Sequence, residues 1–183
     1  MWYVDGTFKY RPLLFAQLYV VHYEYHDHVL PGVVVLMESK SEEAYHAVFT
    51  AMSLLMPEEH RHGPDHFSID FELAASNAFK RVFVAATEQF CFFHFAQSMW
   101  RKLQSSGASA AYMQDDNTVL REQFHAILSL CYVPPCDVPL AFDILANGCE
   151  EELDEVCDHI EDYYVRGRSR GRGRQRPRYA IEK

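Results

Sequence analysis

Two aspartates in this sequence stand where short apolar segments end. Asp5 follows the segment that begins at Trp2, and Asp70 follows the segment that begins at Phe67. Such segments are typical of strands, and carboxylates at the ends of adjacent strands can share a divalent cation. Cations bound in this way serve to cut or join phosphodiester bonds. The pair therefore indicates a candidate metal site, although an aspartate in such a position is also a common turn former or helix cap.

A second candidate group is the pair Cys91 and His94, which two residues separate. A thiolate and an imidazole are zinc ligands, but a closed tetrahedral zinc site needs four ligands. Their spacing does not identify His125, Cys131 or Cys136 as the missing ones, so zinc is not expected here. The simpler alternative is a small buried cysteine beside a histidine at a helix start.

The segments that must position these residues begin with a predicted meander of three strands. Alternating residues on two faces define the second strand, and a continuous apolar run, of the kind buried on both faces of a sheet, defines the third. A polar stretch forms the turn between them. The strands are expected at residues 2–8, 15–23 and 33–37.

Helices and strands alternate after the meander. Ser39 and Glu42 have the spacing of a capping box, which predicts the start of a helix that Pro57 ends. The next expected segments are a strand at 67–70, a helix at 71–82, a strand at 88–93 and a helix at 94–104. Glu72 would stand in the first turn of its helix and interact favourably with the helix dipole. This alternation predicts a mixed α/β sheet.

From residue 106 onward the pattern is helical. Apolar residues recur at helical spacing in three segments, and the last of these segments carries eight acids on its other face. The predicted helices cover residues 118–131, 137–146 and 150–164. We interpret residues 106–165 as a small helical subdomain.

The net charge of −9 conceals a sharp division of charge along the chain. Residues 1–165 hold 9 basic and 25 acidic residues, a net of −16, whereas residues 166–178 hold seven arginines and no acid. The acidic part should repel a phosphate backbone. The tail consists largely of arginine, glycine and other residues that bury no core, so we expect residues 166–183 to be disordered.

The tail has three alternative roles. It can bind nucleic acid electrostatically or act as a nuclear import signal, it can be a solvated linker, or it can fold back on the acids between Glu150 and Asp162. In the first role it would carry the nucleic-acid affinity of the chain, independently of base sequence and with a steep dependence on salt. The candidate phosphate-binding residues are Arg166, Arg168, Arg170, Arg172, Arg174, Arg176 and Arg178.

Composition excludes several classes of protein. The hydrophobic fraction of 49% and the aromatic fraction of 14% suffice for a buried core. No apolar run reaches the roughly 18 residues of a membrane span, and the first residues lack the shape of a signal peptide. The five irregularly spaced cysteines are expected to be reduced thiols. We therefore expect an intracellular protein that is neither secreted nor inserted in a membrane.

The order of five short motifs along the chain is distinctive, although none of them is specific alone. They are Asp5-Gly6-Thr7-Phe8, Phe15-x-Gln17-Leu18-Tyr19, Glu42-Glu43-x-Tyr45, Asp70-Phe71-Glu72-x-Ala74-Ala75-x-Asn77-Ala78 and Cys91-x-x-His94-Phe95-x-Gln97. In this order they resemble the transposase domain of Mutator-like elements, the MULE transposases. The resemblance extends over nearly the whole chain and weakens near residues 128–138. The alternative is an unrelated α/β fold that matches these motifs by chance.

The resemblance implies an α/β architecture with three parts. An RNase H-like core, in which a three-strand meander is continued by β-α-β units, would occupy residues 1–105. A helical insertion subdomain would follow at residues 106–165, and the basic tail at 166–183 would complete the chain.

The resemblance also implies a chemistry. Asp5 and Asp70 would be catalytic residues, the first two carboxylates of an Asp-Asp-Glu (DDE) set that binds Mg²⁺ or Mn²⁺. Cys91 and His94 would be a family marker near that site. The ancestral reaction would be metal-dependent cleavage and strand transfer of DNA in the nucleus. DNA is thus the expected partner, and RNA is a second candidate partner for the arginine-rich tail.

One expected part of the DDE set is not identifiable. The resemblance places a third carboxylate in an Asn-Asn-x-x-Glu segment beyond the helical insertion, and this sequence contains no Asn-Asn pair. Glu182 lacks that context. We therefore expect a chain truncated before the third carboxylate and inactive by itself. The alternative is a non-catalytic domesticated or remnant nuclear protein that binds nucleic acid or protein through its arginine-rich tail.

Overall fold

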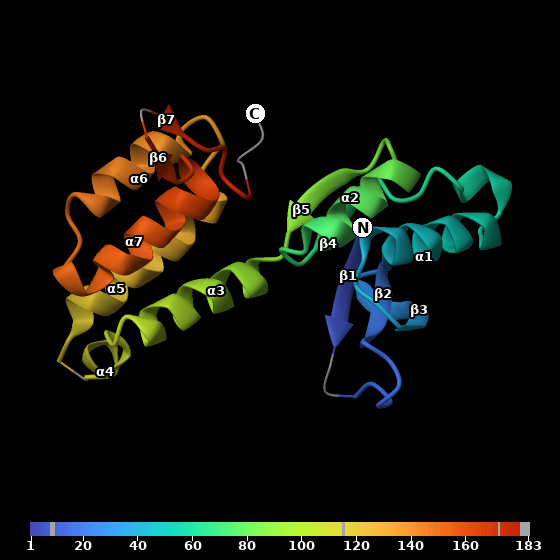
Figure 1. Cartoon of the computed structure of the whole chain (residues 1–183), viewed down its shortest axis with the longest axis horizontal. Coiled ribbons are helices and arrows are strands. Elements are labelled where there is room, and N and C mark those ends of the chain that lie inside the picture. The colour runs from blue at the N-terminus through green and yellow to red at the C-terminus, as the bar shows by residue number, and fades with distance from the viewer. Residues whose placement is uncertain (8–9, 115, 172, 180–183) are drawn as a thin grey trace. The chain divides into compact units, whose positions relative to one another are not determined.

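The structure, a computed structural model, describes residues 1–7, 10–114, 116–171 and 173–179 of the 183 residues (Figure 1). These residues form a five-stranded mixed sheet and seven α-helices, which confirms the mixed α/β class. The chain divides into two compact units, residues 1–91 and residues 92–183. Among the described residues, no helix combines the length and the apolar character needed to cross a bilayer.

The first unit is built around the sheet, whose strands lie in the order β3-β2-β1-β4-β5. β1 and β2 pair antiparallel, as do β2 and β3, whereas β4 pairs parallel with both β1 and β5. The predicted meander is therefore present, and a β-α-β unit continues it. The strands are β1 (Trp2–Thr7), β2 (Gln17–Tyr25), β3 (His28–Met37), β4 (His66–Ile69) and β5 (Thr87–Phe90).

Strand β3 is longer and more exposed than the sequence pattern predicts. A tight turn joins it to β2, and both central residues, His26 and Asp27, have positive φ angles of 45° and 62°. Two successive positive φ angles are typical of the turns that match the twist of a hairpin. Val34 and Leu36 are 60% and 43% exposed. The expectation of a strand buried on both faces is wrong, because β3 is an edge strand and one face of its apolar run is left open.

Two helices cover one face of the sheet, α1 (Glu42–Leu55) and α2 (Leu73–Val82). Phe79 of α2 lies at the centre of the core, where its ring stacks on Phe67 of β4 at 3.8 Å and meets Phe49 of α1 edge-on at 4.9 Å. Helix α1 begins after Ser41, whose hydroxyl accepts a hydrogen bond from the Ala44 backbone N–H at 3.2 Å. The predicted cap at Ser39 is two residues too early.

The second unit is helical apart from one small hairpin. Its helices are α3 (Phe92–Ser105), α4 (Ser109–Tyr112), α5 (Thr118–Leu128), α6 (Val138–Ala146) and α7 (Asp154–Ile160), and α7 continues into a π-helical turn at Glu161–Val165. Short 3₁₀ turns lie at Ser129–Tyr132 and Glu151–Leu153, and a further one, Glu58–His60, belongs to the first unit. The apolar periodicity of residues 118–164 thus predicts the helices of this unit well.

The basic tail has a described conformation up to Tyr179, except for Arg172. Strands β6 (Ser169–Arg170) and β7 (Gly173–Arg174) form a two-stranded hairpin. The expected disorder of this segment is not confirmed. Several of its arginines pair instead with acidic side chains of the same unit.

Candidate metal centre

Strand pairing places Asp5 and Asp70 side by side. β1 and β4 run parallel, and Val4 lies opposite Ile69 in their register. Asp5 and Asp70 are the next residues along the two strands, so both follow the same row of the ladder. Both side chains stand towards the carboxyl ends of parallel strands, the edge at which open α/β sheets usually bind ligands. Asp5 is exposed and Asp70 is half-buried.

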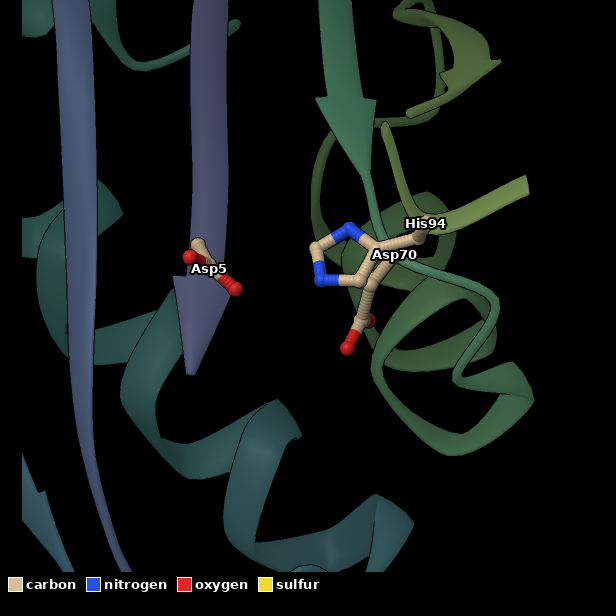
Figure 2. A group of neighbouring side chains, drawn as sticks. All are labelled: Asp5, Asp70 and His94. Carbon is tan, nitrogen blue, oxygen red and sulfur yellow. The ribbon is translucent and has the colours of Figure 1, made fainter. Parts of the chain in front are cut away.

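His94 is the third member of this group. One ligand atom each from Asp5, Asp70 and His94 can be chosen so that all three lie within 4.8 Å of one another. Figure 2 shows these side chains gathered beside the end of strand β1. Two carboxylates and one imidazole form a donor set that suits divalent cations such as Mn²⁺.

Cys91 is the residue that directly follows strand β5, and it does not belong to the group of three ligands. Its backbone N–H donates to the carbonyl oxygen of Ile69 at 2.8 Å, which continues the parallel ladder of β4 and β5 by one residue. The three ligands that lie within reach of one another include no cysteine. The two members of the Cys91–His94 pair therefore have different surroundings. His94 belongs to the group with the aspartates, whereas the half-buried Cys91 follows strand β5 and is not in that group.

A buried polar cluster lies behind Asp5 on the helix-covered face of the sheet. Gln17 is completely buried, and its amide donates to the hydroxyl of Tyr45 at 2.6 Å and to the sulfur of Met37 at 3.2 Å. Gly6 packs directly against the Gln17 amide oxygen, so that a Cβ at this position would collide with it. The glycine beside Asp5 is therefore required by close packing.

Tyr19 adds a buried hydroxyl to this cluster. Its ring lies 5.1 Å from that of Tyr45, and its hydroxyl has no hydrogen-bond partner among the described residues. Burial is the main cause that holds the pKa of Tyr19 well above its usual value, and the neighbouring Tyr45 and Asp70 raise it further. Glu72 and Asp5 act in the same direction. The tyrosine thus stays a neutral hydrogen-bond donor close to the carboxylates.

A family model matches more than half of this chain. The sequence model described as the MULE transposase domain matches residues 1–98, which is more than half of the 183 residues. The chain belongs to the MULE transposase domain family. Comparison with curated proteins and with solved structures gives no match.

The part of the chain matched to the MULE transposase domain contains every residue of the candidate metal centre. It comprises the complete first unit and continues seven residues into α3. Asp5, Asp70 and His94 all lie within it. The match ends well before the arginine-rich tail, so the tail is a feature of this chain that family membership does not explain.

Glu72 has a different place in this MULE transposase domain from the predicted one. It is the N-cap residue of α2 rather than a member of its first turn, and its carboxylate pairs with Lys40 at 2.7 Å. Burial raises the pKa of Tyr45, a rise that the hydrogen bond from Gln17 opposes and that Glu72 reinforces. Glu72 therefore links Lys40 to the buried cluster and is not among the three clustered ligands.

Several polar residues of the sequence motifs, other than the candidate ligands, lie in the buried cluster near the two aspartates. Gln17, Tyr19, Tyr45 and Glu72 come from three of the five motifs that mark the MULE transposase domain. A further motif pair, Glu42 and Asn77, is joined by a hydrogen bond of 3.2 Å between α1 and α2. The signal available in the sequence was the presence of buried-type polar residues inside apolar strands, such as Gln17 in β2.

The residues of the centre fit a divalent metal ion. Ligand atoms around Mg²⁺ stand at 2.0–2.1 Å from the ion and therefore roughly 3 to 4 Å apart, so the observed group needs only a small inward shift. The Gln17 amide oxygen and the Tyr19 hydroxyl are buried and lack partners among the described residues.

The arginines predicted to bind nucleic acid divide into two sets in the second unit. Arg166, Arg168 and Arg174 form ion pairs with Asp143, Glu161 or Asp162. Three others are exposed and make no ion pair among the described residues, and Arg172 lies outside the described residues. The exposed three are Arg170, Arg176 and Arg178.

Proposed function

We propose that this chain is a transposase-derived domain in which Asp5 and Asp70 hold divalent metal ions for chemistry on DNA phosphodiester bonds. The observation that supports it best is the parallel register of β1 and β4, which brings Asp5 and Asp70 to neighbouring positions at one edge of the sheet. Membership of a transposase family implies divalent metal ions and DNA in general. Mg²⁺ and Mn²⁺ are the ions that the carboxylates favour.

The core that carries these residues is proposed to be RNase H-like. The strand order β3-β2-β1-β4-β5, with three antiparallel strands continued by parallel β4 and β5, supports this assignment. We retain residues 1–105 as the functional core, residues 106–165 as a helical insertion and residues 166–183 as a basic tail. Function in the nucleus is part of the same proposal, because DNA is there.

Each residue of the centre has a distinct proposed role. Asp5 and Asp70 supply anionic oxygens that bind the metal, and His94 supplies a neutral donor beside them. The bound ions would activate water or a DNA 3′-hydroxyl and stabilise the leaving oxygen. Gly6 lets β1 approach the Gln17 amide closely, and this packing holds the backbone that carries Asp5.

The proposed catalytic set is incomplete, which limits the activity that we expect. The ligand group among the described residues contains two carboxylates and no third, so we do not expect strand transfer from this chain alone. A non-catalytic domesticated or remnant protein, acting through the arginine-rich tail, is the second candidate function. The exposed Arg170 and Arg176 favour it, because they are free of ion pairs among the described residues.

Metal binding is the direct test of the proposal. Titration of Mn²⁺ into the full chain, followed by calorimetry or electron paramagnetic resonance, should show binding that Asp70→Asn weakens by at least about tenfold, the lower end of what loss of even an outer-shell partner costs. Asp65→Asn is the matched control, because Asp65 is exposed and lies just before the same strand. Equal binding by the two variants would refute the metal site.

Strand transfer is tested separately. Mn²⁺-dependent joining of a terminal-repeat DNA by the purified chain, abolished by Asp70→Ala, would show that the catalytic set is complete after all. Its absence in the presence of normal Mn²⁺ binding is the expected result. Nicking that persists in Asp70→Ala does not come from this site.

A further inference from the structure

We propose that residues 166–179, the arginine arm, form a nucleic-acid-binding surface, and that Glu161 limits the number of its arginines that can bind phosphates. Three of the arginines are engaged by acids of the same unit, and three others are exposed and make no ion pair among the described residues. Phosphates and the Glu161 carboxylate therefore compete for the same guanidinium groups. The inference rests on the proposed contact with nucleic acid, but it does not depend on the metal centre.

Arg166 is the most firmly held arginine of the arm. Its guanidinium donates to Asp143 of α6 at 2.6 Å and to Glu161 at 3.1 Å, and it lies 5.8 Å from the centre of the Phe142 ring. The hydrogen bond from Arg166 lowers the pKa of Asp143. Planar guanidinium groups suit such shared contacts with carboxylates. Arg166 therefore serves as the fixed root of the arm.

Glu161 holds a second arginine with the same carboxylate. Arg174 of strand β7 lies 2.9 Å from the Glu161 oxygen that also contacts Arg166. Arg168 pairs with the adjacent Asp162 at 3.5 Å, and its guanidinium lies 4.7 Å from the centre of the Tyr163 ring. One acidic side chain thus engages two of the seven arginines, so its removal should release more binding capacity than that of any unpaired acid.

Backbone contacts fix the arm at both ends. Gly167 is buried with a φ of +82°, and a Cβ at this position would overlap the Gln175 carbonyl group. Near the other end, the Tyr179 N–H donates to the Tyr163 carbonyl at 2.9 Å, and the Tyr179 ring lies 5.5 Å from that of Tyr164. The arm is therefore folded against the turn that carries Glu161 (Figure 1).

The outward arginines have the chemistry of a phosphate-binding surface. Arg170 and Arg176 are exposed and make no ion pair among the described residues, and Arg178 is exposed beside the ring of Tyr179. Glycine and serine around Arg170 offer no apolar surface that could stack on bases. Nucleic-acid backbones, which present regularly spaced anions, are the partners that such a surface fits.

Competition by phosphates is feasible because the internal pairs are at the surface. Exposed ion pairs are weak and are screened by salt. Among the described arginines, the three without an ion pair are the most available to phosphates, and they should contribute roughly −3 to the slope of log affinity against log salt, at about −0.9 per contact. Seven free arginines would give a much steeper slope.

Charge-matched variants test the role of Glu161. Binding of a fluorescent random-sequence duplex to the full chain is followed by anisotropy between about 50 and 200 mM salt, with EDTA present to exclude metal effects. Glu161→Gln should bind more tightly than wild type, with a salt slope more negative by about 0.9 to 1.8, because one or two arginines are released. Glu152→Gln removes the same charge from an exposed, unpaired side chain and should leave the slope unchanged.

Double arginine variants test whether the arginines without ion pairs, rather than those in ion pairs, bind the phosphates. Arg170→Gln/Arg176→Gln should reduce the magnitude of the slope by about 1.8. Arg166→Gln/Arg174→Gln should keep the slope and instead speed proteolysis within residues 167–179. Equal slopes for Glu161→Gln and Glu152→Gln, or equal losses for the two arginine pairs, would overturn the proposal, as would no duplex binding by any variant at low salt. Unchanged Mn²⁺ binding in these variants shows that the metal centre is tested independently.

Discussion

The two units of this chain arrange their charged groups in opposite ways. In the first unit, Asp5 and Asp70 bring like charges together at the carboxyl ends of parallel strands. In the second unit, acids on α6 and on the turn after α7 are paired with arginines of the same unit. The first arrangement gathers oxygen ligands that a divalent cation can bind, whereas the second is self-neutralising.

The difference follows from what holds each arrangement in place. The aspartates are fixed by backbone hydrogen bonds between strands and by a core of large aromatic side chains around Phe79. The arginine arm is fixed by surface ion pairs and a few backbone contacts. A rigid frame can hold like charges together for a ligand. Surface ion pairs, in contrast, are sensitive to salt and can release the arginines that they hold. Four experiments address this contrast, and the largest expected effect comes first.

Core truncation should affect each unit separately. Phe79→Ala should lower the free energy of unfolding of the first unit by about 3–5 kcal/mol, because it removes a completely buried ring and leaves a cavity. The two tryptophans give separate probes, since Trp2 contacts Phe79 and Trp100 contacts Phe124 of the second unit. Denaturant unfolding is measured in Trp100→Phe and Trp2→Phe backgrounds. Phe124→Ala is the matched control, and identical shifts at both probes would show that the units unfold together.

Glycine replacement should separate the tightly packed sheet from the loosely packed arm. Gly6→Ala should destabilise the first unit by about 1–3 kcal/mol, since the new methyl group forces the buried Gln17 amide to move. Gly173→Ala in strand β7 should change stability by less than about 0.5 kcal/mol, because no atom lies within 4 Å of the added Cβ. Thermal unfolding measures both. Equal effects would mean that Gly6 is not tightly packed.

Removal of single hydroxyl groups should distinguish satisfied from unsatisfied members of the buried cluster. Tyr45→Phe takes away the acceptor of the Gln17 amide and should cost about 1–3 kcal/mol. Tyr19→Phe removes a hydroxyl with no partner among the described residues and should change stability without metal by less than about 1 kcal/mol. Denaturant titrations in EDTA compare them. A larger loss from Tyr19→Phe would contradict the hydrogen-bond assignment.

The smallest expected effect is a pH dependence in the second unit. Burial, followed by the nearby Lys102, lowers the pKa of His159. The unfolded chain then binds a proton more readily than the folded chain, so stability should fall as pH drops below the unfolded value of about 6.5. His159→Gln should weaken this dependence between pH 7.5 and 5.5, as followed by unfolding at Trp100. An unaltered pH profile in the variant would exclude His159 as its source.

Local sequence patterns were sufficient for the elements and for the candidate residues. Helix periodicity anticipated α5, α6 and α7, and apolar segments anticipated the strands that carry Asp5 and Asp70. The order of the five motifs along the chain was enough to indicate the family, because it can be seen in the sequence without knowledge of the fold. These features depend on neighbouring residues, whose steric and hydrogen-bonding preferences are short-ranged.

Local patterns could not decide which elements become neighbours. The pattern of Val33–Met37 is compatible with a central strand, yet β3 is an edge strand whose outer face is open. Ser39 and Ser41 are both acceptable caps, and packing of α1 selected the second. The composition of the tail predicted disorder, and only the structure shows which acids, Asp143 and Glu161, pair with Arg166 and Arg174.

The sequence by itself therefore determined the identities and local settings of the chemical groups. Tertiary structure alone decided that Asp5 and Asp70 directly follow the same paired row of a parallel ladder, that Gln17 and Tyr45 meet behind Gly6, and that Glu161 engages two arginines. The physical reason is that strand register joins residues far apart in the sequence, and that the acid with which an arginine pairs depends on how the intervening chain folds. Each is fixed by the packing of the whole unit, since a slip of one residue would turn every side chain of β1 to the opposite face.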